Sequence, residues 1–158
     1  MMKNIAVFVD VQNIYYTTRD AFGRQFNYQA LWDQLSHDGN ISFANAYAIE
    51  RNDSKQLGFQ KALRHIGFNI KLKPFIQRRD GSAKGDWDVG ITIDMLTVAP
   101  TVDHIVLLSG DGDFDLLMET VAEQHGATTQ VIAVAELTAR SLIDACQQFL
   151  AIDESLLL

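Results

Sequence analysis

The sequence predicts a doubly wound α/β domain with a mostly parallel sheet and helices on both faces. Two observations support this prediction. Short apolar runs of strand length alternate along the 158 residues with segments whose apolar residues recur at helical spacing. Strands separated by helices need crossover connections, which make neighbouring strands parallel. Because no linker or internal repeat interrupts the alternation, we expect a single domain over residues 1–158.

Three strands and three helices are predicted in the first half of the chain. KNIAVFV predicts a buried first strand, and the apolar–polar alternation of FNIKLKPF predicts a strand with one polar face. Residues 54–67 are typical of an amphipathic helix, with Ser54 as its N-cap and Gly67 as its C-terminal stop. The predicted strands are residues 3–9, 41–49 and 68–75, and the predicted helices are residues 14–22, 28 to about 39, and 54–67.

The second half begins with QRRDGSAKG, residues 77–85, a polar segment with two glycines that predicts a mobile loop. Helices then alternate with two further strands, and Pro100 closes the first of these helices. Cys146 lies in a helical pattern without a Cys or His partner nearby, which predicts core packing. The predicted strands are residues 104–109 and 128–135, and the predicted helices are residues 86–99, 113–126 and 137–149.

Charge is unevenly distributed along the chain. The net charge is −7, but residues 51–84 contain nine basic and two acidic residues and carry +7, which leaves −14 for the remainder. Such asymmetry suits a protein that contacts a polyanion with one surface and binds cations at another. Charge alone leaves open the alternative that these residues only form solvated helix and strand faces.

The termini, the cysteine and the histidines limit the class of protein and the kind of metal site further. The N-terminus lacks the pattern of a signal peptide and no apolar stretch approaches about 20 residues, so we expect a cytoplasmic protein with no membrane association. The apolar residues 155–158 are compatible with a homodimer interface. The four histidines and one cysteine show no zinc spacing. Carboxylates, which suit magnesium, manganese or calcium, are therefore the expected ligands of any metal.

Aspartates follow two predicted strands at the edge of the sheet where ligands bind in this fold class. VFVD ends at Asp10 and LLSGD ends at Asp111, so both carboxylates are expected at the same edge. Asp113 and Asp115 follow within the next turn, where capping of a helix is the alternative role. Carboxylates that hold one or two hard cations can polarise a phosphoryl oxygen and activate water. This pattern favours hydrolysis of a phosphodiester.

A third acidic segment precedes the strand that leads to Asp111. Asp88 and Asp94 point about 120° apart on a helix, so both cannot face one ion. We expect Asp88 to be the ligand and Asp94 to make a structural hydrogen bond. A calcium loop is excluded, because its sixth and twelfth positions fall on Leu116 and Ala122 instead of Gly and Glu.

The motifs together resemble the NYN domain of the LabA-like family, a branch of the PIN-like nucleases. They are DVQN at residues 10–13, KGDWD at residues 84–88, SGDGDF at residues 109–114, and a late Ser141–Leu142 pair with Asp144 and Phe149. The resemblance covers nearly the whole chain, and SGDGDF is its most specific part. It implies a five- or six-stranded parallel sheet in the order 3-2-1-4-5, bound Mg²⁺ or Mn²⁺, and cleavage of RNA.

The resemblance also implies roles for individual residues. Asn13 would orient a ligand or touch the scissile phosphate. Ser109 would support Asp111, and both Asn13 and Ser109 are counted among the substrate-binding residues. The choice between Asp86 and Asp88 at the second acidic position stays open. The residues placed in the catalytic site are Asp10, Asn13, Asp88, Asp111 and Asp113, and the four aspartates among them are the implied metal ligands.

A metal-dependent endoribonuclease that acts on single-stranded RNA is therefore the leading hypothesis. Arg78, Arg79 and Lys84 would reach neighbouring phosphates from the polar segment. Exposed aromatic residues could stack on unpaired bases, although core packing is an equal alternative for Tyr15 and Tyr16 and a better one for Trp87. Two other functions stay open: a non-catalytic RNA- or protein-binding regulator that retains the fold, and a hydrolase of small phosphate esters.

Overall fold

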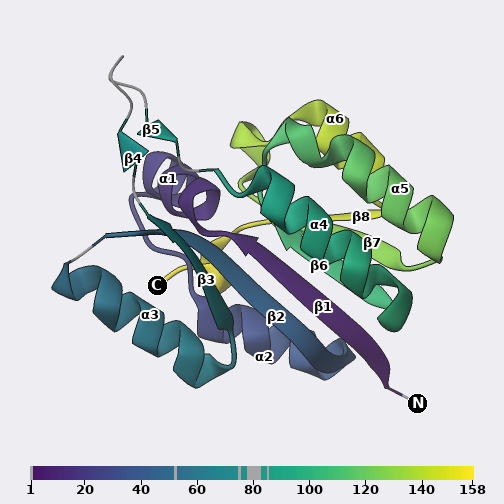
Figure 1. Cartoon of the computed structure of the whole chain (residues 1–158), viewed down its shortest axis with the longest axis horizontal. Coiled ribbons are helices and arrows are strands. Elements are labelled where there is room, and N and C mark those ends of the chain that lie inside the picture. Colours follow the sequence, from purple (N-terminus) through teal and green to yellow (C-terminus); the bar gives the residue numbers. More distant parts are fainter. Residues whose placement is uncertain (1, 52, 75, 78–82, 85) are drawn as a thin grey trace.

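Six strands form the central sheet of the computed structural model, in the order β3-β2-β1-β6-β7-β8 (Figure 1). All pairs of neighbouring strands are parallel. The structure describes residues 2–51, 53–74, 76–77, 83–84 and 86–158. The strands of this sheet are β1 (Lys3–Asp10), β2 (Gly39–Glu50), β3 (Asn69–Pro74), β6 (His104–Leu108), β7 (Thr128–Ala133) and β8 (Gln148–Ala151).

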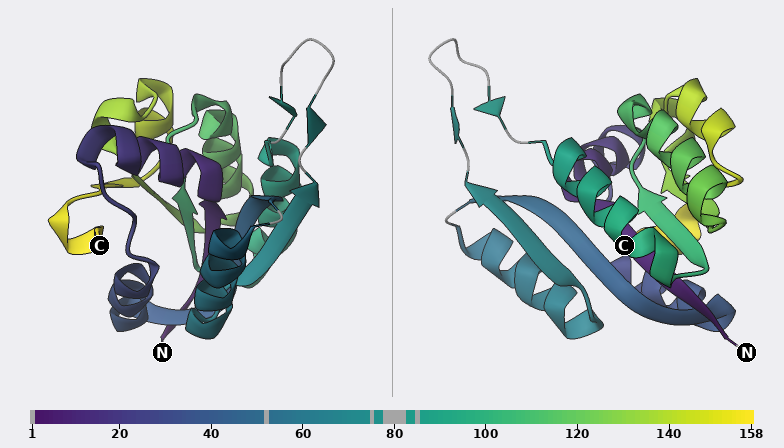
Figure 2. Two further views of the ribbon diagram at one scale, coloured as in Figure 1. Left: turned by 90° about the vertical axis from the view of Figure 1, so that its left-hand side faces the viewer. Right: turned by 45° about the vertical axis from the view of Figure 1, so that its right-hand side comes forward.

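Helices cover both faces of the sheet (Figure 2). Side chains of β1 alternate between two cores: Ile5, Val7 and Val9 pack with the first three helices, whereas Ala6 and Phe8 pack with the last three. The first three helices are α1 (Val11–Phe22), α2 (Tyr28–Asp38) and α3 (Ser54–Ile66), and the last three are α4 (Asp88–Val98), α5 (Asp115–His125) and α6 (Arg140–Ala145). The predicted doubly wound fold and its strand order are confirmed, with a sixth strand added.

The sixth strand corrects the sequence prediction at the C-terminal end. The predicted helix over residues 137–149 is wrong beyond Ala145, because β8 begins at Gln148 and pairs with β7. Two hydrogen bonds start this pairing: the Thr129 amide donates to Gln147 Oε1 at 3.1 Å, and the Gln147 amide donates to Thr129 Oγ1 at 3.1 Å. Pairing with a neighbouring strand overrides the helical spacing of these residues.

Two local predictions around α3 have different outcomes. Asp53, not Ser54, is the N-cap of α3, because the Asp53 carboxylate accepts a hydrogen bond from the Gln56 amide at 2.8 Å. Gly67 ends the helix as predicted, with a φ of 138° that favours glycine.

The polar segment at residues 77–85 was expected to be a loop, but Gln77 and residues 83–84 belong to strands. Strands β4 (Ile76–Gln77) and β5 (Ala83–Lys84) pair antiparallel in a small ribbon. Residues 78–82 and residue 85 lie outside the described residues. The expected mobility of this segment therefore stays a prediction.

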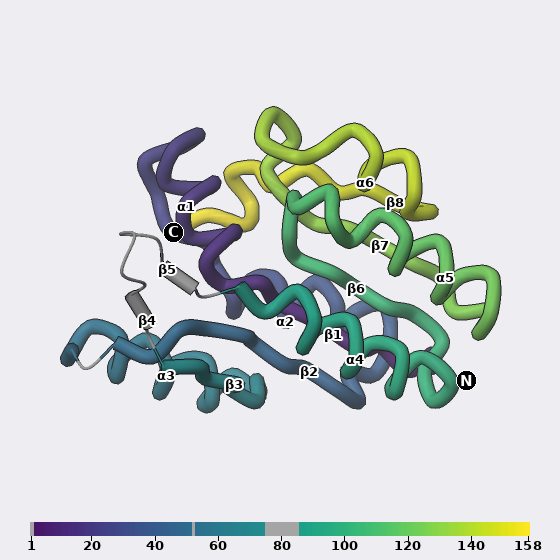
Figure 3. Tube along the Cα trace, turned by 45° about the horizontal axis from the view of Figure 1, so that its top comes forward, coloured from purple at the N-terminus to yellow at the C-terminus, as the bar shows by residue number. Residues whose placement is uncertain are grey.

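The strand order reverses between β1 and β6, the place where ligands bind in this fold class. Val9 of β1 pairs with Leu108 of β6, so the residues that follow these two strands emerge side by side. The first turns of α1 and α4 lie at the same end of the sheet (Figure 3). This edge holds the acidic residues singled out from the sequence.

Candidate metal centre

Asp10 and Ser109 are neighbours because each directly follows a paired strand residue. The Ser109 hydroxyl donates a hydrogen bond to Asp10 Oδ2 at 3.1 Å and accepts one from the Asp111 amide at 3.1 Å. The Asn13 side chain accepts a further bond from the Gly110 amide at 2.9 Å. These bonds fix the start of α1 to the connection between β6 and α5.

The SGDGDF motif owes its glycines to close packing with the segment that precedes α6. A Cβ atom at Gly110 would lie 3.0 Å from the Leu137 carbonyl oxygen, and one at Gly112 would lie 2.8 Å from Ala139 Cβ. The Ala139 amide also donates to the Gly110 carbonyl at 3.1 Å. A side chain at either glycine would therefore displace the acidic loop, residues 110–113, from the segment that precedes α6.

The two acidic residues of the motif belong to a single 3₁₀ turn, Gly112–Phe114. Asp113 lies within the turn, and Asp111 is its N-cap. Asp111 Oδ1 accepts a hydrogen bond from the Asp113 amide at 2.9 Å. Phe114 is buried in the core and anchors the turn. Asp115 differs from both, because its carboxylate accepts a bond from the next amide, Leu116, at the start of α5.

Trp87 sets the position of Asp88 at the start of α4. Its indole Nε1 donates to the Ala48 carbonyl of β2 at 2.9 Å. A Cβ atom at Gly90 would come within 2.5 Å of the indole ring, so the ring packs closely on the first turn of the helix. Asp86 Oδ1 accepts a bond from the Asp88 amide at 3.2 Å. Trp87 is thus held in a structural contact, in agreement with the alternative favoured from the sequence.

Asp88, Asp111 and Asp113 form a compact carboxylate group. One ligand oxygen from each lies within 4.8 Å of the others, and the first two residues are half-buried while Asp113 is exposed. Two oxygens on opposite sides of one hard cation are about 4–5 Å apart, given metal–oxygen distances of roughly 2.0–2.6 Å. The donor chemistry and the spacing therefore fit magnesium, manganese or calcium.

Asp10 lies outside this close group, although it was predicted as a ligand with the other three. Burial is the main cause that raises its pKa from 3.8 to about 6. The hydrogen bond from Ser109 lowers the pKa in part, whereas the charges of Asp111 and Asp86 raise it further. Asp10 is thus close enough to feel the acidic group and is linked to it through Ser109.

The electrostatics of Asp88 show how strongly negative this edge is. Burial is the largest cause that raises its pKa from 3.8 to about 7, and the charges of Asp111, Asp86, Asp10 and Asp113 add to the rise, in that order. Four carboxylates therefore act on a fifth. A cation at this position would relieve the repulsion, which is the physical reason to expect one.

The remaining predicted site residues have mixed placements. Ser109 has no exposed surface for a substrate contact, whereas its predicted support of Asp111 is seen in the hydrogen bond that it accepts from the Asp111 amide. Asp94 makes the predicted structural bond, because it accepts from the Tyr47 hydroxyl at 2.8 Å. Arg78, Arg79 and the side chain of Lys84 lie outside the described residues.

The NYN domain profile matches residues 4–153. The chain belongs to the NYN domain family. Its resemblance to the LabA-like branch is confirmed by the low amplitude and bright protein LabA of Synechococcus elongatus, which is 27% identical over 160 residues that span 96% of this chain and 85% of LabA. The family and the acidic group together fit a nuclease of the PIN-like superfamily.

Solved structures support the NYN fold. A Vibrio parahaemolyticus protein of unknown function is 49% identical, with a TM-score of 0.94, over 99% of this chain and 97% of that one. A ribokinase from Giardia lamblia shares the fold alone, at 12% identity and a TM-score of 0.51, over 94% of this chain and 57% of the kinase. Among the described residues of this NYN domain, no helix is both long and apolar enough to cross a membrane.

Proposed function

We propose that this NYN domain is a metal-dependent endoribonuclease that cleaves single-stranded RNA. The observation that carries the proposal is the convergence of Asp88, Asp111 and Asp113, from two separate elements, at the carboxyl edge of the sheet. These residues would hold Mg²⁺ or Mn²⁺. Such an ion supplies Lewis-acid polarisation of a phosphoryl oxygen and activation of a water nucleophile.

The residues around this group would support it. Asp10 keeps the Ser109 hydroxyl in place, and Ser109 in turn accepts from the Asp111 amide, so the half-buried Asp10 sets the position of the loop. Above its pKa of about 6, Asp10 also adds negative charge that favours a cation. Asn13 uses its carbonyl oxygen to hold Gly110, which leaves its amide NH₂ group to donate to a substrate phosphate.

The basic segment would bind the RNA backbone. Lys73 connects this segment to the acidic edge: its Nζ donates to the Asp86 carbonyl at 3.1 Å and lies 4.4 Å from the centre of the Trp87 ring. Arg78, Arg79 and Lys84 follow along the same segment, where they would contact phosphates on either side of the scissile bond.

The test is cleavage of labelled single-stranded RNA with Mn²⁺ or with EDTA. Asp111→Asn keeps the shape of the side chain but removes a ligand charge, so we expect a loss of about 100-fold or more. Asp115→Asn is the matched control from the same loop, because Asp115 only accepts from the neighbouring amide, and it should cleave like the wild type. Equal cleavage by the Asp111→Asn variant would place the activity elsewhere.

The same assay separates the two rival functions. RNA binding that weakens steeply with salt, without cleavage in Mn²⁺, would replace the nuclease with a binding regulator. Hydrolysis of 4-nitrophenyl phosphate without RNA cleavage would indicate a hydrolase of small esters, which has little use for a basic segment from residue 51 to residue 84.

A further inference from the structure

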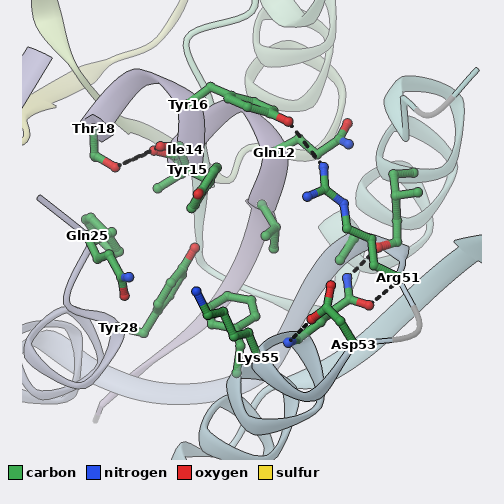
Figure 4. Close-up of a pocket in the computed structure, with 16 residues that line it drawn as sticks. Gln12, Ile14, Tyr15, Tyr16, Thr18, Gln25, Tyr28, Arg51, Asp53 and Lys55 are labelled. Atoms are coloured by element: carbon green, nitrogen blue, oxygen red, sulfur yellow. Dashed lines mark hydrogen bonds between the residues drawn. The ribbon is translucent and has the colours of Figure 1, made fainter. Parts of the chain in front are cut away.

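A pocket of about 510 Å³ opens among the first three helices, which pack on the sheet face opposite α4. Figure 4 shows its lining. Its walls come from α1, from the start of α2, from the end of β2 and from the start of α3. Aromatic rings, side-chain amides and two cations line it together. The rings include Tyr15, Tyr16 and Tyr28, and the cations are Arg51 and Lys55.

The Tyr28 hydroxyl points into this pocket (Figure 4). Tyr28 is only 8% exposed, and its ring packs edge-on against Phe26, Phe59 and Phe68 at centroid distances of 4.9, 5.7 and 6.0 Å. Within the part of the chain that the structure describes, no hydrogen bond satisfies this hydroxyl. The hydroxyl on the pocket wall is therefore a donor that an acceptor atom of a ligand can reach.

The cationic side of the pocket is built by hydrogen bonds. Arg51 Nη2 donates to the Tyr16 hydroxyl at 3.2 Å, and the Arg51 amide donates to the side chain of Gln56. Gln56 is itself tied to the Ile49 carbonyl at 2.5 Å. Asp53, the acidic residue of the lining, is engaged as the N-cap of α3. The guanidinium is thus held at the rim beside an aromatic ring.

Asp10 joins the pocket to the carboxylate group. Val11 and Gln12, which directly follow Asp10, line the pocket. Burial, together with the charge of Asp10, raises the pKa of Tyr28, so its hydroxyl stays a protonated donor at neutral pH. On its other side, Asp10 is linked through Ser109 to Asp111. An RNA strand with a phosphate at the carboxylate group would therefore pass next to the pocket.

We propose that this pocket binds an unstacked nucleoside of the RNA substrate, with its base against the tyrosine rings, an acceptor atom on the Tyr28 hydroxyl, and Arg51 and Lys55 at the adjoining phosphate. Aromatic rings bind bases of any sequence by stacking, and cations bind the backbone beside them. The inference rests on the proposed ribonuclease function and adds to it the site that takes the base.

The test measures binding in EDTA, so that it does not depend on cleavage. AMP, GMP, CMP and UMP are titrated separately into the whole ¹⁵N-labelled protein, with ribose 5-phosphate as the probe that lacks a base. We expect at least one nucleotide to shift the amide signals around Tyr15, Tyr28 and Arg51, and ribose 5-phosphate to bind at least about tenfold more weakly, because stacking is lost.

Three variants identify the contacts. Tyr28→Phe should raise the Kd of the bound nucleotide about fivefold through loss of one hydrogen bond, while its melting temperature stays equal. Tyr16→Ala should raise the Kd about tenfold through loss of stacking. Phe22→Ala is the matched control, because Phe22 lies on the same helix with the same 38% exposure but outside the pocket lining, and its Kd should not change.

The outcomes for the pocket and for the nuclease are separable. Nucleotide binding at the pocket without RNA cleavage would keep the pocket and reject the nuclease. RNA cleavage with no nucleotide-induced shifts around Tyr28 would keep the nuclease and reject the pocket. Equal binding of ribose 5-phosphate, or an unchanged Kd together with a lower melting temperature for Tyr28→Phe, would also overturn the pocket proposal.

Discussion

The two sides of Asp10 are built in opposite ways. On the side of the carboxylate group, the Ser109 hydroxyl and the Asn13 carbonyl oxygen make hydrogen bonds within the protein, and Gly112 permits close contact with Ala139. On the side of the pocket, the Tyr28 hydroxyl faces open space, although its ring is fully packed.

This difference matches what each region has to hold. Carboxylates that gather within a few ångströms repel one another, so a rigid, hydrogen-bonded frame is needed to keep them together until a cation arrives. A base needs shape, apolar surface and a few free polar atoms, so a pocket can leave those atoms unpaired. The carboxylate group reduces the stability of the free protein, which is expected where function and folding compete.

The largest effect should come from neutralising a member of the carboxylate group. Asp88→Asn should lower RNA cleavage about 100-fold or more, because one ligand charge is lost. Asp86→Asn should lower it only about two- to threefold, because Asn can still accept the bond from the Asp88 amide. Cleavage rates under saturating Mn²⁺ measure both. The opposite order of effects would exchange the roles of Asp86 and Asp88.

The second largest effect should be that of the Asp10 charge on the free energy of unfolding. The pKa of Asp10 is about 6 in the folded state and 3.8 in the unfolded chain, so the folded state holds its proton more tightly. Without divalent cations, the stability contributed by protonated Asp10 should therefore be lost as pH rises from about 4 to 6. At about 1.4 kcal/mol for each pKa unit, the loss is roughly 3 kcal/mol.

Urea unfolding of an Asp10→Asn variant in EDTA measures this effect. The variant should be more stable than the wild type at pH 8 by up to about 3 kcal/mol, and similar at pH 4. Mn²⁺ should stabilise the wild type at pH 8 more than at pH 5, because ligands must lose their protons to bind metal. The exposed Asp20→Asn variant is the control. A wild-type protein that gains stability between pH 4 and 6, relative to Asp10→Asn, would contradict the account.

A smaller effect is expected from filling the space at Gly112. Gly112→Ala should destabilise the fold by roughly 1–3 kcal/mol, because its Cβ would lie 2.8 Å from Ala139 Cβ. Gly58→Ala, in the middle of α3 with no atom near its Cβ position, should instead stabilise by about 0.5–1 kcal/mol. Chemical denaturation compares the two. A neutral result at Gly112 would show that the acidic loop is not held by this packing.

The smallest effect concerns the cation that covers Trp87. Lys73→Met removes the ammonium 4.4 Å from the centre of the indole ring and should destabilise by about 0.5–1 kcal/mol. Lys71→Met, two residues earlier on β3, should change stability by less than about 0.5 kcal/mol. Equal stabilities of the two variants would show that this contact contributes nothing to holding the start of α4.

The alternation of apolar strands and helices predicts the parallel sheet and the edge at which Asp10 and Asp111 meet, whereas the strand order follows only from the resemblance to the NYN domain. The sequence does not predict β8, because Phe149 and its neighbours also have helical spacing and only pairing with β7 decides the outcome. The burial of Ser109 follows from the contact of two strands, which a local motif does not encode.

The pocket is the part that sequence patterns miss altogether. Tyr28 occurs in a helical segment and has the pattern of an ordinary core aromatic residue. Its significance lies in a hydroxyl that faces a pocket, and the pocket forms only when α1, α2 and α3 pack together. Arg51 attracts attention from the sequence only as one charge of the basic segment.

The central claim is that Asp88, Asp111 and Asp113 share a divalent cation, and manganese-soaked crystals test it most directly. We predict an anomalous diffraction peak within coordination distance of these three carboxylates, with Asp10 beside it and linked through Ser109. A fully soaked crystal with no peak between them, or with manganese bound at another place, would contradict the claim.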